Sequence, residues 1–231
     1  MHIPDGFLSP EVAATTAAVT AGVLAYSLRR ADAALDERRV PLVGVTGAFI
    51  FAAQMLNFPV AGGTSGHFMG AALAAILLGP WLACLVMAVV LATQAFVFAD
   101  GGITALGANI LNMGVIGALG VGAAMLAARH LLGRAGLRSR GLLLALAGIG
   151  AWTAVMAGAA ATAFELSISG TVPLGTVLPA MLGVHVLIGV GEAVVTIAAV
   201  SAVLATRPDL IAVSDLRPEE IGRPAPGMVT P

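Results

Sequence analysis

Several residue types are scarce in this 231-residue sequence, which contains no lysine, one cysteine and one tyrosine, and in which 10% of the residues are charged. Soluble globular domains carry charge on about a quarter of their residues, so this chain is not typical of that class. The lone Cys84 excludes an internal disulfide framework. The absence of lysine excludes the phosphate-binding loop G-x-x-x-x-G-K-[ST], and the metalloprotease motif H-E-x-x-H is missing too. Because the net charge is −1, we expect no nucleic-acid partner.

Apolar residues, by contrast, are abundant: 59% of the chain is hydrophobic and the mean hydropathy is +1.00. Apolar stretches recur at about the 20-residue length that crosses a bilayer as a helix. We therefore predict an all-α fold, a polytopic membrane helical bundle of about seven transmembrane helices in the lipid bilayer. The third segment is short for a span, which a tilt or a start inside a cavity would accommodate. The seven apolar segments are Pro10–Leu28, Pro41–Leu56, Gly66–Leu78, Trp81–Phe98, Leu106–Ala128, Leu142–Phe164 and Val177–Leu204.

The arginines predict the orientation of this bundle. With seven spans, all eleven fall on the same face, and the positive-inside rule makes that face cytoplasmic. We therefore expect an N-terminus outside, a cytoplasmic C-terminus and a multi-pass location in a bacterial inner membrane. The proline-containing residues 208–231 are predicted to be a cytoplasmic tail that is partly disordered, after a membrane domain of residues 1–207. The arginines follow the first segment (29, 30, 38, 39), the fifth (129, 134, 138, 140) and the seventh (207, 217, 223).

Two histidines on the predicted outer side, His2 and His67, carry the chemistry that the sequence indicates. The amine of Met1, the amide nitrogen of His2 and the His2 imidazole Nδ1 can chelate one ion through a five-membered and a six-membered ring. An amide nitrogen binds a metal only when it is deprotonated, which favours the planar nitrogen sets of Ni(II) and Cu(II). A neutral imidazole from His67 would fill the remaining place. Residues 1–10 are thus a predicted metal-chelating segment.

Polar residues on the same side are candidates to orient these two histidines, because a ligand histidine normally gives its other ring N–H to an oxygen acceptor. Loop capping is the competing interpretation for each. In the last segment His185 and Glu192 lie two turns apart on one face. Ionisable groups inside a membrane-spanning helix are costly and usually face a partner or a pathway. We interpret them as a buried polar pair or relay, and His185 also as a possible ligand. The orienting candidates are Thr64, Ser65, Asp100, Asn109, Asn112 and His185.

Three stretches, MHIPDGFLSP, FPVAGGTSGHFMG followed by AALAAILLGPW, and DGGITALGANILNMG, carry a family resemblance. In order and spacing, from Met1 to about Arg207, they resemble the substrate-binding membrane component of energy-coupling factor cobalt/nickel transporters (the CbiM/NikM family). The resemblance implies seven helices, an N-terminus tucked into the bundle, and an ion held by the Met1 amine, the His2 backbone nitrogen and Nδ1, and His67. It also implies partners: a transmembrane coupling subunit, two cytoplasmic ATPases and often a small accessory membrane protein. The stripe of small residues Gly44, Ala48 and Ala52 is expected to face the coupling subunit.

We therefore expect a substrate-capture subunit of an ATP-driven importer, with Ni(II) favoured and Co(II) uptake for cobalamin synthesis as the alternative. The planar nitrogen set favours nickel, and the residues PDG that follow MHI resemble the nickel members of the family. The transported ion would be the bound ligand, with no catalytic cofactor and no ATPase of its own. The competing hypotheses are an intramembrane enzyme using His185 and Glu192, and a simple channel or structural bundle. A one-residue extension at the N-terminus discriminates among them, because only the chelate depends on it.

Overall fold

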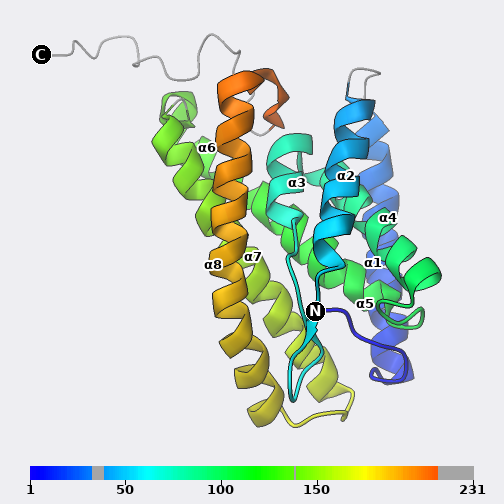
Figure 1. Cartoon of the computed structure of the whole chain (residues 1–231). Coiled ribbons are helices and arrows are strands. Elements are labelled where there is room, and N and C mark those ends of the chain that lie inside the picture. Colours follow the sequence, from blue (N-terminus) through cyan, green and yellow to red (C-terminus); the bar gives the residue numbers. More distant parts are fainter. Residues whose placement is uncertain (33–38, 138, 213–231) are drawn as a thin grey trace, which may run out of the picture.

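The computed structural model describes residues 1–32, 39–137 and 139–212, which form an all-helical bundle with one small hairpin (Figure 1). The predicted all-α bundle of seven helices is confirmed, because α5, η1 and α6 run on as one helix with a π-helical middle. The elements are α1 (Pro10–Asp32), α2 (Val40–Gln54), β1 (Phe58–Pro59), β2 (Ser65–Gly66), α3 (Ala71–Leu78), α4 (Pro80–Phe98), α5 (Leu106–Ile110), η1 (Leu111–Leu119), α6 (Gly120–Leu137), α7 (Arg140–Ile168), α8 (Leu174–Thr206) and the 3₁₀ helix η2 (Pro208–Leu210).

Five of the helices are long and apolar enough to cross a membrane: α1, α4, α5 with its continuation to residue 132, α7 and α8. Helix α2 has 15 residues and α3 only eight. The predicted third segment, Gly66–Leu78, is therefore helical over little more than its second half. Its first residues are extended, and Gly70 at φ +77° begins the helix in a backbone conformation that only glycine adopts without strain.

The short helix α3 forms the centre of the bundle, and all eight of its side chains are buried. Because α3 contacts α4, α7, η1 and α8, its carbonyl and amide groups are shielded from lipid on every side. The outer surface is apolar as well, with large exposed side chains such as Val89 and Leu187. A bilayer favours apolar side chains on the outer surface, and buried polar residues such as His67 and Glu192 lie inside the bundle.

The helix ends that carry arginine lie together at the upper end in Figure 1. They are the last turn of α1, the start of α2, the second half of α6, the start of α7 and the residue after α8. Arg38, Arg138, Arg217 and Arg223 lie outside the described residues. The predicted tail starts at residue 208, but η2 and the buried Ile211 still belong to the bundle, and residues 213–231 of that tail lie outside the described residues.

Candidate metal site

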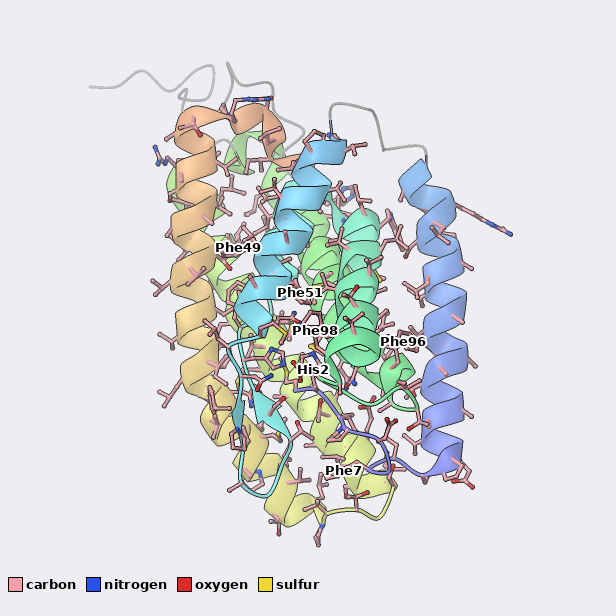
Figure 2. All side chains as sticks on the ribbon, turned by 45° about the vertical axis from the view of Figure 1, so that its right-hand side comes forward. His2, Phe7, Phe49, Phe51, Phe96 and Phe98 are labelled. Carbon is pink, nitrogen blue, oxygen red and sulfur yellow. The ribbon has the colours of Figure 1, made fainter. Side chains whose placement is uncertain are left out.

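The first three residues of the chain lie inside the bundle. Met1 and Ile3 are 0% exposed and His2 is 4% exposed, and both figures show the N-terminal segment among the helices (Figures 1 and 2). The Met1 side chain reaches α7, where a Cβ on Gly158 would lie 3.2 Å from the Met1 sulfur. Chain ends are usually loose unless the fold holds them, so the sequence must provide groups that hold this one.

Main-chain groups of the segment are held by two elements. The amide oxygen of Asn109 accepts a hydrogen bond from Ile3 N at 2.8 Å, and its amide nitrogen donates to Ile3 O at 3.1 Å. Gly102 N also donates to Ile3 O, at 2.8 Å. Asn109 lies at the end of α5, immediately before the π-helix η1, and such helix irregularities occur frequently at functional sites.

Farther along the segment, two threonines hold its exposed turn. Asp5 Oδ1 accepts from both the backbone N–H and the hydroxyl of Thr104, and the Thr171 hydroxyl donates to Phe7 O. A Cβ on Gly102 would overlap the main chain of Pro4 and Asp5, coming within 2.6 Å of the Pro4 carbonyl carbon. The glycine pair in DGGIT thus lets the 99–105 loop press directly against the N-terminal segment.

Ser65 accepts hydrogen bonds from the first two residues of the chain. The Met1 amine donates to the Ser65 carbonyl and, at 3.0 Å, to its hydroxyl, and His2 N donates to the same hydroxyl at 3.1 Å. Burial lowers the pKa of the amine to about 4, although the nearby Asp100 charge acts in the opposite direction. The amine is therefore neutral at physiological pH, which is the form that binds a metal.

The rings of His2 and His67 are stacked, with centroids 4.4 Å apart and planes 19° apart. His2 Nε2 lies 3.1 Å from Gln94 Oε1, and His67 Nδ1 lies 2.8 Å from the Phe68 carbonyl. Because a carbonyl oxygen can only accept, the bonded nitrogens carry the protons, and the lone pairs are on His2 Nδ1 and His67 Nε2. Both of these atoms are buried without a hydrogen-bond partner among the described residues.

Burial keeps both of these imidazoles neutral. It lowers the pKa of His2 to about 3, with the charge of the N-terminus as the next cause, and it lowers the pKa of His67 well below its ordinary value. An unpaired buried acceptor costs free energy, and neutral imidazole nitrogens are common metal ligands. Two such nitrogens beside a neutral amine are donors that a cation could use, which makes this a candidate metal site.

His185 and Glu192 both face the interior from α8, but they do not form the predicted pair. His185 Nδ1 bonds to Met181 O at 2.6 Å, and its Nε2 is buried with no partner among the described residues. Both carboxylate oxygens of Glu192 accept main-chain N–H groups, from Met69 at 2.7 Å and from Gly70 at 2.6 Å. The carboxylate thus holds the start of α3 and the chain that directly follows His67.

The orienting candidates divide into two groups. Ser65, Asn109 and Asp100 lie at the site, and Asp100 Oδ1 is 3.3 Å from His2 Nδ1. Thr64 instead donates to the Met181 sulfur at 3.9 Å, and Asn112 donates to Thr162 and Glu165, so neither bonds to His2 or His67.

Two side chains near the candidate site were not predicted from the sequence. Gln94 on α4 bonds to His2, and the amide nitrogen of Gln54 on α2 donates to Met69 O at 2.7 Å. Each is a lone amide in an otherwise apolar segment, which marks it as a buried polar group but does not identify its partner. Gln94 thus fixes the segment that carries His2, and Gln54 fixes the segment that carries His67.

A cavity of about 490 Å³ leads from the surface to His2. The N-terminal segment, the β1–β2 hairpin and the 99–105 loop line it, and its charged residues are Asp5 and Asp100; none of the described residues that line it is an arginine. Among the described residues, no three His, Cys, Asp or Glu side chains are grouped so that they could hold a metal ion. A metal at His2 and His67 would therefore need other donors, and the nitrogens of Met1 and His2 beside Ser65 are candidates.

Comparison with known proteins decides the family of this chain. The family model CbiM, described as the cobalt uptake substrate-specific transmembrane region, matches residues 2–210. The chain belongs to the CbiM family. It is accordingly a membrane component of a cobalt/nickel transporter and not an enzyme, so the hypothesis of an intramembrane enzyme built on His185 and Glu192 is wrong.

Relatives of this CbiM-family chain include nickel proteins. It is 38% identical over 228 residues to the fused nickel transport protein NikMN of Rhodobacter capsulatus, covering 92% of this chain and 64% of that protein. It is 42% identical over 213 residues to the fused NikMN chain of Archaeoglobus fulgidus, named provisionally as a nickel transport protein, covering 91% and 68%. About a third of each fused protein thus lies outside the match.

Solved structures confirm the fold of this CbiM-family chain. The crystal structure of a truncated transition metal transporter is 33% identical, with a TM-score of 0.79, covering 89% of this chain and 99% of that chain. A second transition metal transporter structure is 32% identical, with a TM-score of 0.77, covering 91% and 96%. The fold is therefore that of a multi-pass metal transporter component.

Proposed function

We propose that this CbiM-family chain captures Ni(II) from the outer side of the membrane with its own N-terminus. The donors are the Met1 amine, the deprotonated His2 amide nitrogen, His2 Nδ1 and His67 Nε2. The observation that carries this proposal is the pair of buried, unpartnered imidazole nitrogens on stacked rings next to a buried amine. Binding displaces the hydrogen bonds that Ser65 accepts from Met1 N and His2 N, so Ser65 holds these donors in place until the ion arrives.

The proposed donor set favours nickel over cobalt. A planar arrangement of nitrogens that includes a deprotonated amide is a strong ligand field, which suits Ni(II). The nickel names of the Rhodobacter and Archaeoglobus relatives support the same choice. Uptake of Co(II) by the same chelate is the alternative.

We further propose that transport requires other chains, because the sequence has no nucleotide-binding loop. A transmembrane coupling subunit and cytoplasmic ATPases would drive release, and an accessory N component is supported by the relatives in which M and N are fused. The small-residue stripe Gly44, Ala48 and Ala52 is exposed along α2, and Gly44 and Ala48 line an apolar groove between α2 and α4. This exposed stripe is the proposed contact for the coupling subunit.

The proposed orientation places the cavity outside. The loops that line it lie at the end of the bundle opposite the arginine-bearing helix ends (Figure 1). Arginine on the cytoplasmic side is the usual arrangement of a multi-pass protein. An ion from outside would therefore meet the cavity first and His2 at its inner end.

The experiment compares the purified full chain with a variant that carries one alanine between Met1 and His2. The insertion keeps every side chain but moves the amine away from the His2 amide, so the variant should lose Ni(II) and the yellow absorption of planar, diamagnetic nickel. An alanine inserted between Gly6 and Phe7, in the exposed turn, is the matched control and should retain both. Equal nickel content in all three chains would refute the chelate.

A further inference from the structure

Two acceptor atoms face each other at the inner end of the cavity. Asp100 Oδ1 lies 3.3 Å from His2 Nδ1, yet the geometry makes no hydrogen bond, and Nδ1 has no partner among the described residues. The bond from His2 Nε2 to Gln94 leaves a lone pair on Nδ1. Two electron-rich atoms at this distance repel unless a cation lies between them. With bonds of about 2.1 Å to each atom, a divalent metal ion can span this distance of 3.3 Å.

Asp100 is fixed in this position by its neighbours. Asn57 Nδ2 donates to its other oxygen, Oδ2, at 2.9 Å, and the backbone N–H of Asp100 donates to Gln94 O at 3.0 Å. Ala99, at φ +54°, turns the chain sharply at the end of α4 and aims Asp100 toward His2. The bond from Asn57 leaves Oδ1 as the carboxylate oxygen that faces the histidine.

The cavity around Asp100 suits an incoming cation. The Asp100 side chain is 16% exposed, whereas that of His2 is 3% exposed, so an ion reaches the carboxylate first. Asp5 adds a second negative charge to the lining, and clefts lined by one sign of charge raise the rate at which an opposite charge arrives. A carboxylate oxygen also suits a hydrated ion that still carries its water, because hard oxygen ligands replace water readily.

We propose that Asp100 Oδ1 and His2 Nδ1 form an encounter site for the divalent cation, through which it passes to the final chelate. This inference rests on the proposed function and adds the route to the same site. His2 Nδ1 belongs to both sites, so the ion keeps one bond while it exchanges the others. The Met1 amine, the His2 amide nitrogen and His67 Nε2 then replace Asp100 and the remaining water, while Asp100 Oδ2 keeps its bond with Asn57.

The test is stopped-flow absorption of Ni(II) binding to the metal-free full chain in lipid nanodiscs. Asp100→Ala should slow association by about tenfold or more, the lower end of what such charge effects supply. Dissociation should slow in proportion, because an encounter site lies on the path in both directions. Equilibrium nickel content should therefore change little. Asp100→Glu keeps a carboxylate and should recover part of the rate, which also shows that the position tolerates substitution.

Asp5→Asn is the matched control, because it removes one negative charge from the same cavity while an amide oxygen can still accept both bonds from Thr104. It should slow association much less than Asp100→Ala does, because Asp5 lies in the exposed turn, where it is bonded to Thr104. Faster dissociation of Asp100→Ala with unchanged association would show that Asp100 only orients His2, and unchanged rates would show no role; either result overturns the encounter site. If instead the wild-type chain takes up no Ni(II), or the Met1–His2 insertion variant takes it up equally, the proposed function itself fails.

Discussion

The first three residues of this chain are more deeply buried than the first helix that follows them, which is the reverse of the usual pattern. Met1, His2 and Ile3 are all buried, whereas 17% of the residues in the most apolar window of α1 are buried. In most domains the terminus is loose and the first helix contributes to the core. Here the helix faces outward and the terminus occupies the interior, as expected if the terminus is part of the binding site.

The two regions are also held by different forces. Asn109, Ser65 and Gly102 bind the backbone of the terminal segment through hydrogen bonds. Helix α1 packs on α5 by close backbone contact, since a Cβ on Gly107 would come within 2.6 Å of Ala17 N, and Thr20 donates to Gly107 O at 2.8 Å. We therefore expect that small changes in the groups that hold residues 1–3 weaken metal binding, while changes on the exposed face of α1 are tolerated.

Gly102→Ala should give the largest effect. The added methyl overlaps the main chain of Pro4 and Asp5, which cannot move without withdrawing His2. We expect a loss of about 3 kcal/mol, which is roughly a hundredfold in the Kd for Ni(II) measured by metal competition. Gly22→Ala in α1 is the matched control, because a Cβ there meets no described atom within 4 Å, and its Kd should be unchanged. Equal affinities for the two variants would show that the contact of Gly102 with the N-terminal segment does not control nickel binding.

Asn109→Ala should come next. It leaves both the N–H and the carbonyl of Ile3 without their buried side-chain partner, and such a loss costs about 1–3 kcal/mol. Nickel affinity should fall roughly 10- to 100-fold, and the thermal unfolding temperature of the metal-free chain should fall with it. Asn109→Leu is close to asparagine in size but can form neither hydrogen bond with Ile3, so it should weaken nickel binding as much as alanine does. If Asn109→Leu binds nickel as the wild type does, the hydrogen bonds to Ile3 do not hold the terminus.

Glu192→Gln should have a smaller and more specific effect. The amide oxygen can still accept one of the two N–H groups of Met69 and Gly70, while the amide nitrogen faces the other. We expect a loss of about 1–2 kcal/mol in the free energy of unfolding and a shifted nickel absorption band, because His67 is no longer held in one position. Retention of the wild-type band would mean that Glu192 stabilises α3 without positioning His67.

Val19→Ala in α1 should give the smallest effect. Val19 is 48% exposed on the outer face of the bundle, where lipid rather than protein surrounds it. Stability should change by less than about 0.5 kcal/mol and nickel affinity should not change, as judged by thermal unfolding and metal competition. A clear drop in nickel affinity would mean that α1 is coupled to the site after all.

The bundle was predictable from apolar segments and arginine placement, but the irregular regions were not. Residues 66–78 read as one apolar run, and periodicity cannot separate its extended start from the helix that begins at Ala71. The π-helical turn of η1 has no hydropathy signature either. The start of α3 is held by a contact with another helix, that of Glu192 with Met69 N and Gly70 N, which the sequence does not show.

Some residues of the candidate site were likewise predictable from the sequence, and others were not. Met1 and His2 were predicted because their donor chemistry depends only on their place at the start of the chain, and His67 because of its motif. Asn109 and Ser65 were found as polar residues on the correct side. Gln94 was missed, and Glu192 was assigned to His185, because one sequence does not show which polar group a helix brings to which loop.

Nickel K-edge X-ray absorption of the loaded full chain shows whether the chain binds its ion with its own terminus. We expect four nitrogen donors in a plane, with the scattering signature of two imidazoles and no sulfur. A tetrahedral or octahedral spectrum, oxygen-dominated coordination, or a spectrum unchanged by the alanine between Met1 and His2 would contradict it.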